Sequence, residues 1–319
     1  MEMRLYRSAQ LLLLFVATAI TSACNPSAYT RPAQDFLAAT DTLEQIYFLE
    51  WDISGKATVE LGDLEDQFAI WGAPAGVSAE QIERVAARMQ QRRSEDIHGE
   101  LRPLREQAFA ALKGYADTLA ALSSDAPTGE ITGELRGLVD DMSGIVARAG
   151  ELSADISRVR RFTGPLEQYV NILNELITLV SDIMREKAIV ATIVKSNRPV
   201  NELLGILREE ALFAERNADE KLGSSSAMLD RFINSDQFAN ASNLDKANIA
   251  ARRAGLGVLR EQMERVEIEE TFTLALEAQG ALLNKAVLDD PGEWSRKIAE
   301  FRNRVERSRI VIETIRADM

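Results

Sequence analysis

The sequence predicts an all-α fold, an elongated antiparallel bundle of long helices, and three observations predict it. First, the residues that sandwiches and barrels use in turns and strands are scarce, with 18 Gly, 8 Pro, 11 Phe, 5 Tyr and 3 Trp in 319 residues. Second, residues 166–194 carry an apolar stripe three positions wide per heptad, which is typical of a helix buried in a bundle. Third, prolines separate stretches with helical spacing, as they do at helix ends. These are Pro74, Pro127, Pro165, Pro199 and Pro291.

Prolines and capping residues set the boundaries of the predicted helices. Residues 25–32 are expected to form a short tether before the first of them. Residues 53–71 are assigned to irregular structure or a short helix, because a lone strand there would have no partner. The expected helices are 33–50, 78–123, 128–161, 165–196, 199–222, 226–239, 243–288 and 291–317.

Local signals justify these elements in chain order. The second helix begins with a capping box, in which Ser78 precedes Gln81 by three residues, and Pro103 is expected to kink it. The next three helices begin at or just after a proline. The serine run at 223–227 predicts a helix break, with one serine as the next N-cap.

The last two helices carry the strongest start signals. Ser242 stands three residues before Asp245, which again places a hydroxyl N-cap ahead of an acid. Asp290, Pro291 and Glu293 supply an acid at the N-cap, proline at the first helical position and an acid at the third.

The first 23 residues are typical of a secretory signal. Arg4 and Arg7 form a positive region, an apolar core occupies 11–20, and small residues follow it. The core is too short for a transmembrane helix, and the only cysteine of the protein, Cys24, comes directly afterwards.

The run Ile20-Thr21-Ser22-Ala23-Cys24 resembles the lipobox of bacterial lipoproteins, with Thr21 where that family most often has leucine. The resemblance implies cleavage between Ala23 and Cys24 and a covalent lipid on the Cys24 thiol. It divides the chain into a signal segment (1–23), a lipidated cysteine with its tether (24–32) and a helical-bundle domain (33–319). Asn25, in place of the aspartate that retains many such proteins in the inner membrane, favours the outer membrane of the cell envelope.

Charge and composition restrict the function classes. The net charge of −13 argues against nucleic acid as a partner. One cysteine and one histidine argue against a metal site, and no nucleotide-binding loop or nucleophile elbow is present. We therefore expect no enzyme activity, no metal and no cofactor other than the lipid on Cys24.

Two clusters of ionisable residues are interpreted as solvent-exposed side chains rather than as metal sites. His98 follows Glu95 in a Glu-x-x-His unit, but a di-iron site needs two such units, so an exposed histidine is expected. The acidic run at 264–270 alternates with arginines and is expected to be a solvated helix face. Its acidic members are Glu264, Glu267, Glu269 and Glu270.

Glycines and aromatic residues give the remaining candidate sites. Gly129, Gly133 and Gly137 repeat every four residues, which indicates close helix packing or a weak helix that acts as a hinge. Seven aromatic residues gather between positions 29 and 71, where they form either an interaction patch near the anchor or a hydrophobic cap of the bundle. The proposed patch is Tyr47, Phe48, Trp51, Phe68 and Trp71.

Together these features lead us to expect a membrane-anchored envelope protein with a non-catalytic helical scaffold or interaction domain, which binds another envelope protein. The alternative is a membrane-active protein, or one that binds lipid or a small molecule, for which residues 172–194 are the only sufficiently apolar stretch. Five charged residues in that stretch argue against its insertion.

Overall fold

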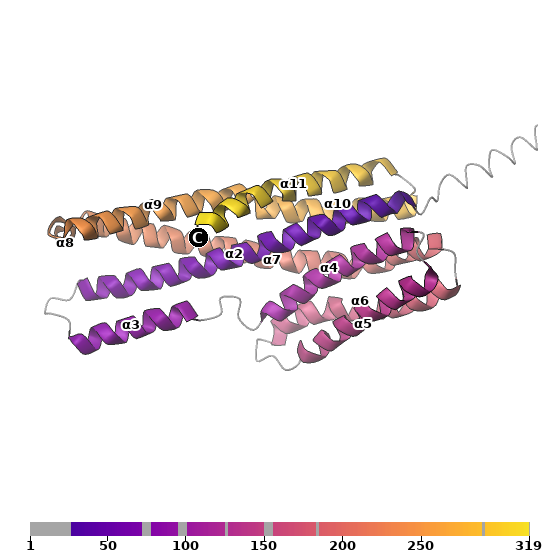
Figure 1. Ribbon diagram of the computed structural model, residues 1–319, viewed down its shortest axis with the longest axis horizontal. Helices are drawn as coiled ribbons and strands as arrows, with labels where there is room; N and C mark the ends of the chain where they lie inside the picture. The colour runs from indigo at the N-terminus through magenta and orange to yellow at the C-terminus, as the bar shows by residue number, and fades with distance from the viewer. Residues whose placement is uncertain are drawn as a thin grey trace, which may run out of the picture. The chain divides into compact units, whose positions relative to one another are not determined.

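The structure is a computed structural model that describes residues 27–71, 78–94, 101–124, 127–149, 156–182, 185–288 and 291–318. Within these ranges the chain is helical and contains no strand, which confirms the prediction of an all-α helical bundle. The helices are labelled in Figure 1. They are α2 (Ser27–Trp71), α3 (Ala79–Ser94), α4 (Arg102–Ser123), α5 (Thr128–Ala149), α6 (Ile156–Asp182), α7 (Arg185–Ile233), α8 (Asp236–Ala239), α9 (Asn243–Val266), α10 (Ile268–Leu288) and α11 (Pro291–Asp318).

The helices form two compact units. Unit 1 contains the described residues up to Asp41, together with Pro103–Gly205 and Thr273–Asn303. Unit 2 contains the described residues of Thr42–Arg102, Ile206–Phe272 and Arg304–Met319.

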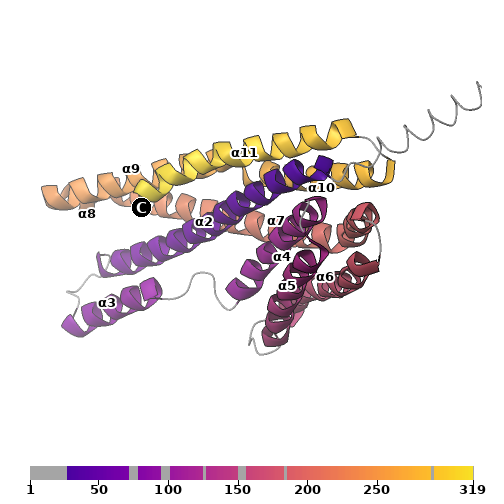
Figure 2. The same ribbon diagram turned by 45° about the vertical axis from the view of Figure 1, so that its right-hand side comes forward.

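Aromatic rings fill the core of unit 1. The Phe36 ring of α2 lies 6.5 Å from the Tyr115 ring of α4 and 5.8 Å from the Phe301 ring of α11, measured between ring centroids. The Gln279 side chain of α10 donates a buried hydrogen bond to the Tyr115 hydroxyl (3.2 Å). Helices α5 and α6 lie side by side in both views (Figures 1 and 2).

In unit 2, the part of α2 after Asp41 runs parallel to α7. The Tyr47 hydroxyl donates to the Glu210 carboxylate (3.0 Å), and the Asn217 amide donates to Ser54 Oγ (2.7 Å). Both pairs are 163 residues apart, so the two helices advance in the same direction. Parallel neighbours need a long connection, which α3–α6 supply.

Ion pairs attach α9 and α3 to the other helices of unit 2. Helix α9 runs antiparallel to α7, because Asp219 pairs with Arg260 (2.9 Å) while Asp230, further along α7, pairs with the earlier Arg253 (2.5 Å). Helix α3 lies along α2, where Arg88 and Arg92 both pair with Asp66 (2.9 and 2.7 Å).

Several predicted boundaries were right. Ser78 Oγ accepts from the Gln81 amide, and the Ser78 amide donates to the Gln81 side chain (3.2 and 3.0 Å), which completes the capping box. Ser242 caps α9 and accepts from the Asp245 amide (3.2 Å), and α11 begins at Pro291. The predicted kink at Pro103 is instead the start of a separate helix, α4, whose second residue is Pro103.

Other boundaries were wrong because burial overrides local breakers. Pro165 and Pro199 lie inside α6 and α7, where each is buried, and α7 also continues through the serines at 223–227. A helix-interior proline costs roughly 3 kcal/mol. The buried neighbours Phe162 and Leu203, among others, offset that cost. Likewise, α2 begins at Ser27, inside the expected tether, and continues through 53–71 as regular helix.

The apolar stripe at 166–194 belongs to two helices rather than one. Helix α6 ends at Asp182 and α7 begins at Arg185, and the Lys195–Glu175 ion pair joins them as an antiparallel pair. Only the α6 part of the stripe is buried, at Leu166, Tyr169, Leu173 and Leu176, whereas in α7 Val190 is half-buried and Val194 is exposed, so the prediction of one buried stripe was wrong beyond α6. The predicted helix 243–288 also divides, at Glu267, whose φ of 49° ends α9 in the left-handed region.

Candidate functional site

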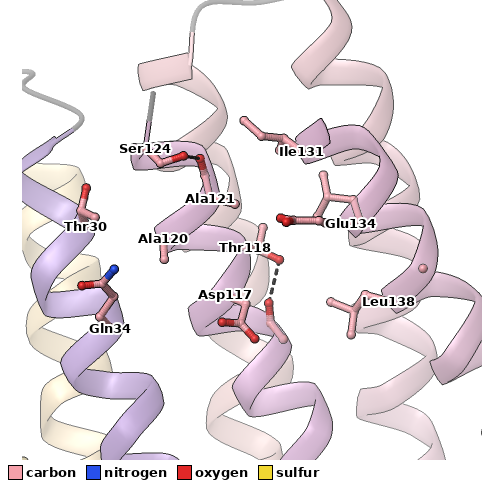
Figure 3. Close-up of a pocket in the computed structure, with 13 residues that line it drawn as sticks. Thr30, Gln34, Asp117, Thr118, Ala120, Ala121, Ser124, Ile131, Glu134 and Leu138 are labelled. Carbon is pink, nitrogen blue, oxygen red and sulfur yellow. Dashed lines mark hydrogen bonds between the residues drawn. The ribbon is translucent and has the colours of Figure 1, made fainter. Parts of the chain in front are cut away.

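An open groove of about 610 Å³ lies in unit 1 between the N-terminal turns of α2, the C-terminal half of α4 and the first half of α5 (Figure 3). This volume is within the range of ligand-binding pockets, about 300–1,000 Å³. The described residues that line it are Thr30, Gln34, Gly114, Asp117, Thr118, Ala120, Ala121, Ser124, Ile131, Glu134, Leu135, Gly137 and Leu138.

Small residues create the groove. At Gly114 a Cβ would lie 2.6 Å from a methyl carbon of Leu138, so the absence of a side chain lets α4 and α5 approach. Above this contact, Ala120 and Ala121 leave the space open on the α4 side (Figure 3). The Thr30 hydroxyl donates to the Ser123 carbonyl (3.1 Å), which ties the start of α2 to the end of α4.

The hydroxyl groups of the α4 wall are turned onto their own helix. Thr118 Oγ1 donates to the Gly114 carbonyl, and Ser124 Oγ donates to the Ala121 carbonyl (both 2.7 Å, dashed in Figure 3). Both hydroxyls therefore donate their proton to a backbone carbonyl of the same helix.

Two carboxylates, Asp117 on α4 and Glu134 on α5, dominate the electrostatics of the groove. Both are exposed, and neither forms an ion pair within the described part of the chain. Partial burial raises the pKa of Asp117, the negative charges of Asp41 and Glu134 raise it further, and Lys113 acts in the opposite direction. Lys113 itself pairs with Asp41 (3.2 Å). The lining residues include no cation, so the groove has a net negative charge that suits a cationic group.

Sequence reasoning missed this site. Its residues come from three helices, and no local spacing connects Gln34, Asp117 and Glu134. Only the packing of α2, α4 and α5 brings them together.

A second unusual group lies in unit 2, where Glu50 of α2 is completely buried. Neither carboxylate oxygen has a hydrogen-bond partner among the described residues. Burial, and secondarily the charge of Glu215 on α7, raises its pKa to about 8. Glu215 lines a separate hollow of about 320 Å³ between α7 and α9.

The predicted aromatic patch does not form one exposed surface. Tyr47 is fully buried and forms part of the core of unit 2, while Phe48, Trp51 and Phe68 are half-buried. The Phe48 ring lies under the Arg102 guanidinium (5.8 Å). Trp71 belongs to α2, but its side chain is outside the described residues.

The other two half-buried rings each meet a ring of α7. Trp51 lies 6.3 Å from Phe213, which is 52% exposed and was not part of the predicted patch. Phe68 lies 5.0 Å from Phe232, which is itself buried, and therefore contributes to packing.

The predicted glycine hinge lies on an exposed face of α5. A Cβ added at Gly129, Gly133 or Gly137 would meet nothing within 4 Å, so these glycines are not needed for close helix packing. Helix α5 is continuous through all three, and Gly137 lines the groove.

The carboxylates of the acidic run are engaged in ion pairs. Glu264 pairs with Arg260, Glu269 with Arg208, and both Glu267 and Glu270 with Arg304. No group of three or more potential metal ligands occurs in the ranges that the structure describes.

Some predictions concern parts of the chain that the structure does not describe. Ala23, Cys24, Glu95 and His98 lie outside the described residues. Within the described ranges, no helix has both the length and the apolar character that crossing a bilayer requires.

The chain matches no family model, no curated protein and no solved structure. Its function is therefore inferred from the residues and their arrangement alone.

Proposed function

We propose that the protein is a bacterial envelope lipoprotein, anchored through acylated Cys24, whose helical domain is a non-catalytic scaffold that binds another envelope protein. The observation that carries the interaction role is the groove between α2, α4 and α5. It is open, and its carboxylates have no ion-pair partner within the described part of the chain. The Thr118 and Ser124 hydroxyls of its α4 wall donate to carbonyls of their own helix.

The place of the groove in the sequence supports an envelope partner. Its first residue, Thr30, follows Cys24 by six positions, and six residues span at most about 20 Å. If Cys24 carries acyl chains, the groove stays close to the membrane surface. Partners would then be proteins that approach that surface.

Photo-crosslinking in the native envelope tests this proposal. A benzophenone amino acid replaces Gln34, which is exposed at the groove, and in a matched control it replaces Leu244, which is 71% exposed on α9. We expect one dominant protein adduct from position 34 and none of the same mass from position 244. An adduct with lipid or a small molecule alone would support the alternative, a lipid-binding or membrane-active protein.

The anchor is tested separately by metabolic labelling with an alkyne analogue of palmitate. We expect the wild-type chain to incorporate the label and the Cys24→Ser variant to lose it, together with its recovery in the membrane fraction. An unlabelled wild-type chain would refute the lipoprotein assignment, whatever the crosslinking result.

A further inference from the structure

The groove of unit 1 contains two negative charges and lacks the positive charge that would balance them. Asp117 and Glu134 face it from adjacent helices, and the Glu134 carboxylate points toward α4 in Figure 3. The nearest cation that acts on Asp117 is Lys113, which is already paired with Asp41. A positive group that entered the groove would interact with both carboxylates and would relieve their mutual repulsion.

The shape of the groove suits a side chain rather than a bare ion. Apart from the carboxylates, the lining of the groove is mainly apolar or small, with Ala120, Ala121, Ile131 and Leu135 among its members. Such a lining can contact the methylene groups of a long basic side chain while the carboxylates receive its charged end. Arginine and lysine both combine these two parts.

The surroundings of the groove allow a polypeptide to approach. Gly137 lines the groove, and together with Gly133 and Gly129 it forms an exposed stripe on α5 where added Cβ atoms would meet nothing within 4 Å. The α5 backbone is therefore accessible to another chain. Gln34, on the opposite wall, presents an exposed amide that can both donate and accept hydrogen bonds.

We propose that this groove binds an arginine or lysine side chain of a protein partner. The inference rests on the proposed interaction function and specifies the chemistry of the partner. It commits to a basic protein segment because the carboxylates supply charge complementarity and the open, glycine-lined rim leaves room for a backbone.

Fluorescence anisotropy of the full-length lipoprotein in detergent tests the proposal with two labelled probes. One is an alanine-based helical peptide with two arginines one turn apart, and the other is the same peptide with glutamines in their place. We expect the arginine peptide to bind about tenfold or more tightly than the glutamine peptide, since charge-assisted contacts of this kind are worth about 1.4 kcal/mol or more. Equal affinities for the two peptides would overturn the proposal.

A matched pair of double variants separates the groove from the overall negative charge. Asp117→Asn with Glu134→Gln should remove the preference for arginine, leaving less than about a twofold difference. Glu264→Gln with Glu313→Gln removes the same charge from exposed positions on α9 and α11, and should retain the preference. If both double variants lose it equally, the binding is non-specific attraction to an acidic protein and the proposal is wrong.

The fold of the groove variant is checked by circular dichroism. Because neighbouring carboxylates disfavour the charged form of Asp117, we expect its replacement by asparagine to leave the midpoint of thermal unfolding unchanged or higher. A binding loss with an intact fold is then attributable to the carboxylates. If the fold is lost, Asp117→Asn and Glu134→Gln are measured singly, and each should lower the preference.

The crosslinking experiment distinguishes this inference from the proposed function. If position 34 gives a protein adduct but the arginine and glutamine peptides bind equally well, the scaffold function remains supported. The proposal that the groove binds a basic side chain would then be wrong. Peptide preference without any protein adduct in the envelope would refute the scaffold function instead.

Discussion

At the scale of single residues, Glu50 is the group whose surroundings fit its charge least well. It lies on α2 between two cross-helix hydrogen bonds, Tyr47 to Glu210 and Asn217 to Ser54. Neither of these bonds reaches the Glu50 carboxylate, which is completely buried without a partner among the described residues. The protein therefore holds Glu50 in its protonated form around neutral pH, since its pKa is raised to about 8 by burial and by Glu215.

This raised pKa predicts a specific pH dependence of stability. Below about pH 4.5, Glu50 is protonated in both the folded and the unfolded chain, so it has no differential effect. Between about 4.5 and 8, only the unfolded chain releases the proton, so the free energy of unfolding falls as pH rises, by up to about 1.4 kcal/mol per pH unit. Glu50→Gln should flatten this fall and exceed the wild type in stability at pH 9.

Urea unfolding followed by circular dichroism at pH 5, 7 and 9 provides the measurement. Glu313→Gln, at an exposed position on α11, is the control and should keep the wild-type pH profile. Identical profiles for the wild type and Glu50→Gln would mean that another group causes the pH dependence.

The sequence does not reveal residues of this kind. Glu50 is one of many acids in an acidic chain, and its burial depends on α7, which begins more than 130 residues later. Asp117 and Glu134 likewise acquire their roles only when α4 and α5 pack together. Caps were predictable because their chemistry is local, as the bonds between Ser78 and Gln81 illustrate.

At the scale of secondary-structure elements, replacing exposed glycines by alanine should stabilise α5. Its exposed glycines lack a packing role, and glycine in a helix costs roughly 0.5–1 kcal/mol relative to alanine. We expect Gly129→Ala and Gly133→Ala each to raise the free energy of unfolding by about 0.5–1 kcal/mol, measured in urea. Gly114→Ala is the contrasting variant, because its Cβ would lie 2.6 Å from a Leu138 methyl carbon and the displacement of that side chain would offset the gain.

The same variants test the predicted hinge. If flexibility of α5 serves partner binding, the stabilised Gly129→Ala and Gly133→Ala variants should give weaker crosslinking from position 34. If stability rises and crosslinking stays unchanged, the flexibility of α5 has no role in partner binding and the hinge prediction is wrong.

The sequence predicted which segments are helical better than it predicted where each helix begins and ends. Periodicity does not register a change of helix: the apolar spacing of residues 166–194 continues past Asp182, yet only its α6 part is buried, and α7 buries other positions such as Ile189 and Ile193. Conversely, Pro165 and Pro199 signal breaks locally, and the burial of their neighbours keeps the helices continuous. The parallel course of α2 and α7 leaves no local signal, since it depends on the long connection through α3–α6.

At the scale of the whole molecule, the net charge of −13 would govern how the proposed lipoprotein meets a membrane. Loss of the signal segment would remove Arg4, Arg7 and Glu2 and would change the net charge to −14. Such a chain is repelled by anionic headgroups, and only its acyl chains, at about 0.8 kcal/mol per buried CH₂, would hold it there. Membrane binding should therefore depend on acylated Cys24 and on no surface of the helical domain.

Vesicle sedimentation tests this expectation directly. The Cys24→Ser variant, prepared without its signal segment, should fail to sediment with phosphatidylglycerol vesicles even at low ionic strength, where attraction to charged lipids is strongest. It should also release no dye trapped inside them. The acylated chain should sediment at both low and high salt, because burial of acyl chains does not require charge. Dye release by the unacylated variant would instead favour the membrane-active alternative, since release without an anchor requires the helices themselves to enter the bilayer.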